Sequence, residues 1–195
     1  MENYLRNHPY FEELNISIIL DYKIRLITPD LKYAQASLEW ISDKGVGQFM
    51  GADFSDVSLA GEEKRLTEII QNRDAYNWII EVDGKAVGNI NINEIEDATK
   101  EFGVKAGKLN YLIGDKSLWG KGITTAIAKE VLNWAFNKGD FKVIKSRAIP
   151  QNKASLAVLK KLGFEEYKKE EYDGPDLGQP TEYLAHKLYK PDSNS

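Results

Sequence analysis

The segment from Leu109 to Thr125 combines residue types that could bind an anion. It runs from an apolar stretch through a polar loop and two alternating glycines to the start of a helix. A helix N-terminus carries unpaired backbone N–H groups and about half a positive elementary charge. Gly120 and Gly122 would let an anion approach this backbone closely. The segment therefore predicts a site for a phosphorylated ligand.

Two common phosphate-binding motifs match this segment poorly. A P-loop has four residues between its first glycine and the Gly-Lys pair, and a hydroxyl residue follows that pair. Here five residues separate Gly114 from Gly120-Lys121, and a glycine comes next. A dinucleotide fingerprint has a third glycine where Thr125 stands, and an acidic residue at the end of its second strand. Asp140 has roughly the right spacing but precedes the next predicted strand.

A third design agrees better with the spacing. The run Trp119-Gly120-Lys121-Gly122-Ile123-Thr124 resembles the acetyl-CoA pyrophosphate loop of the GNAT acetyltransferases, of general form Gln/Arg-x-x-Gly-x-Gly/Ala. Trp119 replaces the usual first polar residue, and Thr124 replaces the last small one. A Trp-Gly-Lys-Gly run is typical of the RimJ/RimL-like branch of that family. The alternative is a glycine-rich turn that only connects a strand to a helix.

A second motif about thirty residues downstream resembles the same family. GNAT proteins commonly show Asn-x-x-Ala/Ser, an amphipathic helix and then Gly-Phe, and Asn152, Ser155, Gly163 and Phe164 fall in that register. Many branches carry a tyrosine seven residues after the asparagine, where it protonates the departing thiolate. Leu159 occupies this place here. The RimJ/RimL-like branch typically lacks that tyrosine and has a serine at the position of Ser155.

The N-terminal half of the chain also resembles this branch. Residues 22–30 are similar to its opening strand and helix entry, and Trp40-Ile-Ser-Asp43 is similar to the Trp-x-Ser-Asp stretch that commonly follows. The resemblance extends from about residue 20 to residue 190. We therefore expect an N-terminal extension over residues 1–20, a GNAT domain over residues 21–190 and a tail over residues 191–195.

Hydrophobic periodicity and turn signals predict the elements of this domain. Strands are expected at residues 22–27, 77–82, 86–92, 108–113, 142–148, 165–171 and 182–188, with a hairpin turn at Asp83-Gly84. Helices are expected at residues 31–42, 59–72 and 154–162, and from Ile123 to a stop at Gly139. Residues 10–20 are treated as a separate short element, and residues 45–58 and 93–107 as loop and polar connection. This order is that of the GNAT fold, an α/β (α+β) mixed sheet with helices on both faces.

The resemblance also implies a site. In the GNAT fold two adjacent parallel strands splay apart and admit the pantetheine arm, and here these would be residues 108–113 and 142–148. Ser155 would donate a hydrogen bond to the leaving thiolate; its alternative role is to cap the helix that begins nearby. The residues implied to bind acetyl-CoA are Leu112 and Ile113 through their backbone, the loop Trp119, Gly120, Lys121, Gly122, Ile123 and Thr124, and Asn152.

The composition excludes several other classes of protein. The 195 residues carry a net charge of −4, which argues against general nucleic-acid binding. The chain has no cysteine, and His8 and His186 stand alone in the sequence, so no metal site is expected and both histidines are predicted at the surface. No apolar run approaches a membrane span, and the N-terminus does not resemble a signal peptide. A cytoplasmic location is the default expectation.

Positive charge is nevertheless concentrated in one stretch. Six basic residues and no acidic one lie between Phe141 and Phe164. We expect those around Lys145, Lys153 and Lys160 to meet the 3′-phosphate of coenzyme A, with a solvated surface as the alternative. No general base is assigned, although Glu94 and Glu96 follow a strand on the expected substrate side.

The implied function is transfer of an acetyl group from acetyl-CoA to a primary amine. The acceptor would be a small molecule or a protein N-terminus, and the residues do not choose between them. The alternative from another class is an acyl-CoA-binding sensor or scaffold without turnover. Neither a nucleic acid nor a membrane is expected as a partner, and a homodimer is compatible with the assignment.

Overall fold

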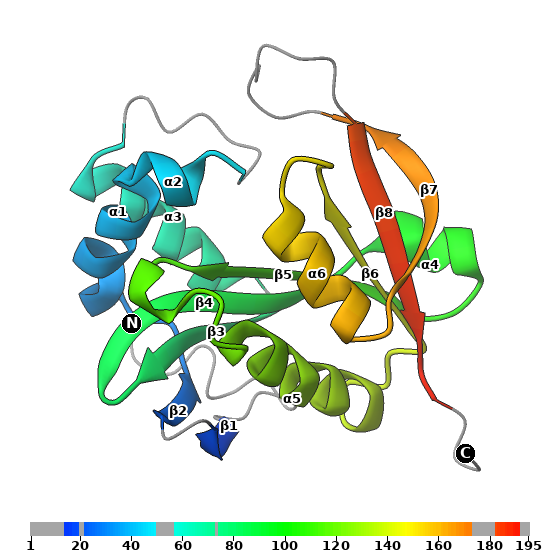
Figure 1. Cartoon of the computed structure of the whole chain (residues 1–195), viewed down its shortest axis with the longest axis horizontal. Coiled ribbons are helices and arrows are strands. Elements are labelled where there is room, and N and C mark those ends of the chain that lie inside the picture. The colour runs from blue at the N-terminus through cyan, green and yellow to red at the C-terminus, as the bar shows by residue number, and fades with distance from the viewer. Residues whose placement is uncertain (1–13, 20–21, 50–56, 73, 173–181, 192–195) are drawn as a thin grey trace.

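A computed structural model describes residues 14–19, 22–49, 57–72, 74–172 and 182–191 of the chain. Its centre is an eight-stranded sheet in the order β1-β2-β3-β4-β5-β6-β8-β7. Neighbouring strands are antiparallel except β5 and β6, which are parallel. Figure 1 shows α5 and α6 in front of the sheet, α1 to α3 grouped at one end, and α4 behind β8. The predicted mixed α/β fold is confirmed.

The element bounds agree closely with those expected from periodicity. The strands are β1 (Leu14–Ile19), β2 (Tyr22–Ile27), β3 (Ala75–Val82), β4 (Lys85–Glu94), β5 (Ala106–Ile113), β6 (Val143–Ala148), β7 (Glu165–Glu171) and β8 (Glu182–Tyr189). The longer helices are α1 (Ala34–Ser42), α3 (Leu59–Gln71), α5 (Ile123–Asn137) and α6 (Lys153–Lys161). The turn between β3 and β4 has φ of 49° at Asp83 and 83° at Gly84, the left-handed pair of a two-residue hairpin.

Three predicted segments differ from the structure. The loop expected at residues 45–58 begins with a short helix, α2 (Lys44–Gly47), because the Asp43 carboxylate accepts hydrogen bonds from two N–H groups of its first turn. The polar connection at residues 93–107 contains α4 (Glu96–Phe102), which ends at Gly103 with φ of 68°. The helix expected at residues 31–42 starts as a 3-10 turn, η2 (Leu31–Tyr33). The glycines of residues 45–58 concealed α2, and the polar composition of residues 93–107 concealed α4.

The predicted N-terminal extension contains β1, which pairs with β2 and so adds a strand to the sheet. The two histidines were predicted at the surface. His186 is buried instead, and its Nδ1 lies 2.9 Å from the Leu184 carbonyl oxygen, whereas His8 lies outside the described residues. No helix within the described ranges is long and apolar enough to cross a membrane.

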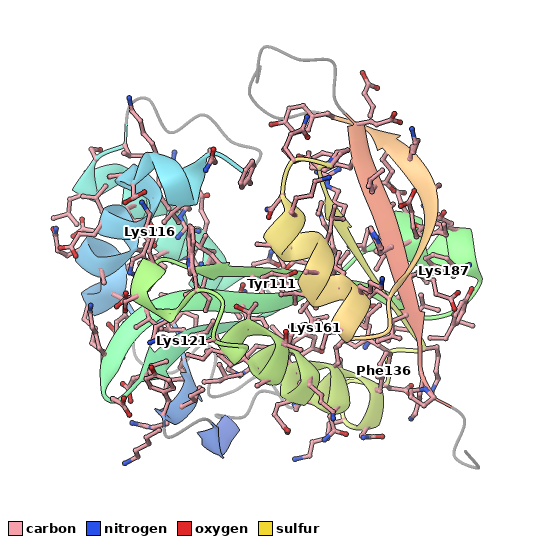
Figure 2. All side chains as sticks on the ribbon, viewed as in Figure 1. Tyr111, Lys116, Lys121, Phe136, Lys161 and Lys187 are labelled. Carbon is pink, nitrogen blue, oxygen red and sulfur yellow. The ribbon has the colours of Figure 1, made fainter. Side chains whose placement is uncertain are left out.

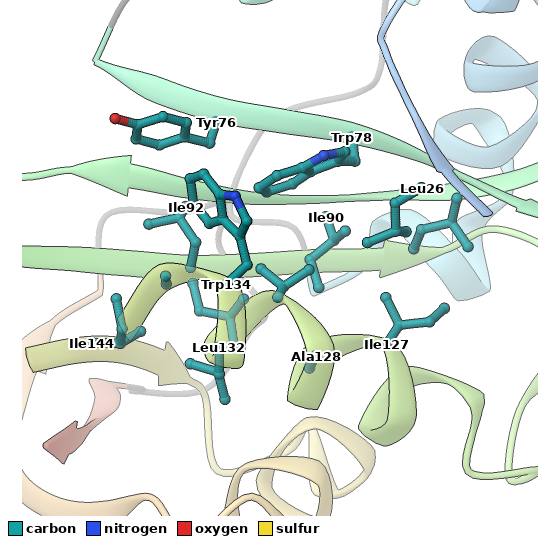
Figure 3. Close-up of a cluster of buried hydrophobic side chains, with 14 of the residues drawn as sticks. Leu26, Tyr76, Trp78, Ile90, Ile92, Ile127, Ala128, Leu132, Trp134 and Ile144 are labelled. Carbon is teal, nitrogen blue, oxygen red and sulfur yellow. The ribbon is translucent and has the colours of Figure 1, made fainter. Parts of the chain in front are cut away.

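The main core lies between α5 and the sheet (Figure 3). Trp134 of α5 packs edge-on against Tyr76 and Trp78 of β3, with ring centroids 4.7 Å and 5.1 Å apart. Ile90, Ile92 and other apolar side chains of the central strands complete this layer. Burial of such large side chains contributes about 1.5–3 kcal/mol each. This packing fixes the axis of α5, and therefore the place of its N-terminus.

The parallel strands β5 and β6 stay together over only a short length. Their ladder joins Ala106 to Val143, Gly107 to Ile144 and Lys108 to Lys145. One residue further, the Ser146 hydroxyl donates a 3.0 Å hydrogen bond to the Leu109 carbonyl in place of a backbone contact. Beyond that point β5 continues to Ile113 beside β4 alone, and Figure 1 shows β6 turning away from it. The predicted splay of these two strands is confirmed.

Candidate active site

The N-terminus of α5 has the form of an anion site. Gly120 and Gly122 adopt φ of 74° and 80°, a left-handed backbone that glycine reaches without strain. Gly122 is the N-cap of α5, so no side chain caps the helix, and its first turn carries no acidic residue. By contrast, Ser58 caps α3 and Asn152 caps α6 with side-chain oxygens. Within the described residues no side chain caps these N–H groups, so they could bind phosphate oxygens.

The loop before α5 is attached to the sheet by its side chains. Trp119, which replaces the usual polar residue, donates a 2.8 Å hydrogen bond from its indole Nε1 to the Ile113 carbonyl at the end of β5. The Ile113 carbonyl oxygen therefore already accepts a hydrogen bond within the protein. Lys121 Nζ donates to the Tyr22 hydroxyl of β2 at 2.8 Å. Lys121 and Trp119 thus have partners within the protein, although both are exposed.

The N-terminal motif reaches the same loop. A Cβ atom on Gly114 would lie 2.1 Å from Trp40, so only glycine allows α1 to approach the end of β5 this closely. Asp43 pairs with Lys116 at 2.5 Å. The hydrogen bond from the Ser117 hydroxyl holds the pKa of Asp115 below its usual range, and Lys85 lowers this pKa further. Burial acts in the opposite direction, but its effect is smaller than that of Ser117. The loop is therefore held from β4, α1 and its own side chains.

The start of α6 lies beside β5 (Figure 2 labels Tyr111 there). Asn152 Oδ1 accepts a 3.0 Å hydrogen bond from the Ser155 backbone N–H. Asn152 is therefore the cap of α6, and the alternative role for Ser155 as that cap is wrong. The Ser155 Oγ instead lies 2.9 Å from the Tyr111 hydroxyl of β5. Burial raises the pKa of Tyr111 to about 12, although its hydrogen bond with Ser155 lowers it in part.

A separate groove of about 500 Å³ lies between α5, the C-terminal end of α6 and the end of β8. Thr125, in the first turn of α5, lines one end, and Leu132 and Phe136 lie further along the same helix. Lys129 and Lys161 bring positive charge to its walls. Figure 2 places Lys161 where α6 approaches α5. The sequence signal for Lys129 was weak because it stands outside the basic stretch.

The basic stretch does not form one surface. Lys145, expected at the 3′-phosphate, is buried, and its Nζ pairs with Glu170 at 2.9 Å. Lys153 and Lys160 are exposed on α6, and Lys160 does not line the groove. The predicted contact is wrong for Lys145, because alternation along β6 turns its side chain toward the carboxylates on β7 and α4.

The two carboxylates considered as bases also have partners. Glu94 lies 3.5 Å from Lys105, and Glu96 pairs with Lys100 on α4 at 2.8 Å. Glu94 is opposite Gly107, near the far end of β5 from Ile113. Within the part of the chain that the structure describes, no group of three or more histidine, aspartate or glutamate side chains is placed to hold a metal ion.

Comparison with known families assigns this arrangement. Residues 23–165, most of the chain, match the acetyltransferase (GNAT) domain. The chain belongs to the GNAT acetyltransferase family. The predicted family is thereby confirmed, and the splayed strands and the uncapped helix are the parts of this GNAT domain that surround the candidate site.

Named relatives of this GNAT domain are distant. The probable N-acetyltransferase YjcK of Bacillus subtilis is 27% identical over 112 residues, which are 55% of this chain and 59% of YjcK. An uncharacterized protein of Methanocaldococcus jannaschii is 32% identical over 85 residues, 44% of this chain but only 16% of that protein. This chain therefore spans less than two thirds of either relative.

Solved structures share the fold. RimL, a ribosomal-protein α-N-acetyltransferase in complex with coenzyme A, superposes with a TM-score of 0.73 over 91% of this chain and 98% of its own. The sequence identity is 17%. At this identity the likeness establishes the common fold, and the site must be argued from the residues present here.

Proposed function

We propose that this protein transfers the acetyl group of acetyl-CoA to the primary amine of a small molecule or a protein N-terminus. One observation carries the proposal: α5 presents an uncapped N-terminus behind two left-handed glycines, at the end of a strand that has separated from its parallel neighbour. Acetyl-CoA, when bound, supplies an activated acetyl group, whose transfer forms a C–N bond and releases a thiol. The backbone N–H groups at the start of α5 suit a pyrophosphate, and the open edge of β5 suits the extended pantetheine arm.

The glycine loop would hold the pyrophosphate. The N–H groups at Ile123 and Thr124 would donate to its oxygens, and the positive end of α5 would offset their charge. Gly120 and Gly122 leave room for this contact, while Trp119 and Lys121 fix the loop through Ile113 and Tyr22. We expect Asn152 to act mainly by holding the start of α6.

The open edge of β5 would receive the pantetheine arm and the acetyl carbonyl. Beyond Lys108 this edge has lost its ladder with β6, so backbone groups near Leu112 can pair with an extended ligand. A backbone donor at this point would polarise the thioester as an oxyanion hole does. Ser155, beside β5, would donate to the sulfur as negative charge develops there.

The groove between α5 and α6 would hold the nucleotide end of the molecule. Lys161 lines this groove and its neighbour Lys160 does not, which provides a matched pair. We expect coenzyme A to bind more tightly than dephospho-coenzyme A, and Lys161→Ala to remove most of this difference. Lys160→Ala should retain it. Equal affinities of the unmodified protein for both ligands would show that no cation meets the 3′-phosphate.

Two measurements test the proposed activity. Calorimetry with coenzyme A measures binding, and thiol release from acetyl-CoA in the presence of a panel of amines measures transfer. We expect micromolar binding and release that depends on one class of amine. Absence of binding would refute the cofactor assignment. Binding without release across small amines and N-terminal peptides would favour the alternative of a sensor or scaffold.

Several further expectations rest on the sequence. These predictions are a domain boundary at residue 20, a cytoplasmic location, the absence of nucleic-acid and membrane partners, and a homodimer. Cell fractionation and sedimentation velocity would test the location and the assembly state.

A further inference from the structure

The hydroxyls of Tyr111 on β5 and Ser155 on α6 form a pair. Tyr111 lies on β5 and Ser155 in the first turn of α6, forty-four residues apart in sequence, with their oxygens 2.9 Å apart. The Tyr111 hydroxyl is also 3.4 Å from the Ser155 carbonyl oxygen. Both side chains are partly buried, and Tyr111 packs against the main core. The contact is therefore held by the core and does not depend on a flexible surface.

The position of Ser155 is fixed independently of this contact. Its backbone N–H donates to the Asn152 cap, so the remaining freedom of the side chain is rotation about χ1 and of the hydroxyl hydrogen. A hydrogen bond donated by Tyr111 would occupy a lone pair of Oγ and direct the Ser155 proton elsewhere. A hydroxyl that accepts one hydrogen bond also becomes a better donor in the next.

Either hydroxyl could donate in this contact, and the protonation state of Tyr111 allows the phenol to be the donor. Because burial raises the pKa of Tyr111 to about 12, the phenol keeps its proton at neutral pH and can donate. An ordinary thiol has a pKa of about 8.5, so a thiolate would not take the proton from this phenol. Tyr111 can therefore strengthen a hydrogen bond to sulfur without becoming a phenolate.

We propose that Tyr111 is a positioning residue, which donates to the Ser155 hydroxyl and so aims and strengthens the hydrogen bond from Ser155 to the departing thiolate. This inference rests on the proposed function. When the C–S bond breaks, its electron pair stays on sulfur, and the two hydroxyls stabilise that charge while both protons stay on oxygen. Solvent protonates the thiolate later. Leu159 of α6 stands where many GNAT branches carry a tyrosine. Here Tyr111 of β5 contacts Ser155 instead.

Titration of bound coenzyme A tests the pair without any acceptor amine. Thiolate absorbance of the complex, followed against pH, gives the pKa of the bound thiol. We expect it to lie below that of free coenzyme A, and Tyr111→Phe to raise it by about one unit. Ser155→Ala should raise it at least as far, and the double variant no further, because Tyr111 acts through Ser155. Tyr189→Phe, an exposed tyrosine on β8, is the matched control and should change nothing.

Turnover gives a second, independent readout. Tyr111→Phe should lower kcat about tenfold or more while the KM for acetyl-CoA stays within about twofold, since the pair acts as charge develops on sulfur. A thiol pKa unaffected by Tyr111→Phe, or effects of the two substitutions that add fully, would overturn the proposal. Titration as expected without acetylation of any amine would refute only the proposed transfer. Failure to bind coenzyme A would refute both.

Discussion

Two glycines with the same backbone conformation serve different purposes in this protein. Gly84 has φ of 83° in the β3–β4 turn, and Gly120 has φ of 74° before α5. A Cβ atom at either position would meet no atom of the described residues within 4 Å. The intrinsic cost of a side chain there is therefore similar, on the order of 1–2 kcal/mol for a left-handed residue. What differs is the ligand expected beside Gly120.

Replacing each glycine by alanine separates these effects. Gly84→Ala and Gly120→Ala should lower the free energy of unfolding by comparable amounts, about 1 kcal/mol. Gly120→Ala alone should weaken coenzyme A binding about tenfold or more, which corresponds to about 1.4 kcal/mol. Chemical denaturation and calorimetry on the two variants provide the measurements. Equal ligand affinities would place the pyrophosphate away from this loop.

Among the elements, α6 combines a structural cap with a candidate catalytic residue. Asn152 accepts from the Ser155 N–H, so the residue that starts the helix also orients the hydroxyl one turn inside it. Ser58 does the same for α3 by accepting from the Gly61 N–H at 3.2 Å. The two caps are chemically comparable, and only the cap of α6 lies beside the splayed strands.

The caps therefore form a second matched pair. Asn152→Ala and Ser58→Ala should each destabilise the fold by about 1 kcal/mol, the usual cost of losing an N-cap. Only Asn152→Ala should also lower kcat, because Ser155 loses its anchor. Asn152→Ser keeps a capping oxygen and should recover most of both properties. Loss of stability without any change in kcat would mean that Ser155 is held by Tyr111 alone.

At the scale of the whole molecule, an ion-pair cluster joins the C-terminal strands to α4. Lys145 of β6 contacts Glu170 of β7 at 2.9 Å and Glu101 of α4 at 3.9 Å. Lys168 bonds to Glu101 at 2.7 Å, and Arg147 lies 3.8 Å from Glu170. Since the Lys145 side chain is buried, removal of its partner carboxylate would leave a positive charge poorly solvated.

This cluster predicts a pH-dependent contribution to stability. Burial alone would raise the pKa of Glu170, but Lys145 and Lys168 outweigh it and hold the pKa below the usual 4.5. Its stabilisation is present above pH 4.5 and is lost as the pH falls through the folded-state pKa. Glu170→Gln should cost about 1–3 kcal/mol at pH 7, and progressively less as the pH falls below 4.5. A difference in unfolding free energy that does not shrink on acidification would contradict this.

The sequence by itself determined the features that depend on neighbouring residues. The strand, loop and helix that form the candidate phosphate-binding segment are contiguous, so the glycine spacing and apolar periodicity were enough to predict them. The Asp83-Gly84 turn and the stop of α5 near Gly139 were equally local. The family followed from two short motifs, because each is contiguous in sequence: one contains the left-handed glycines before α5, and the other begins with the cap of α6.

Only the tertiary structure decided which side chains meet. Tyr111 and Ser155 are forty-four residues apart, and their contact depends on how α6 crosses β5. Lys145 belonged to a basic stretch in the sequence, yet the register of β6 with β8, and of β8 with β7, directs it to Glu170. Such pairings are set by sheet register and helix packing, which local periodicity does not encode. The candidate anion site is therefore visible in the sequence, while the partner of the candidate catalytic serine is visible only in the fold.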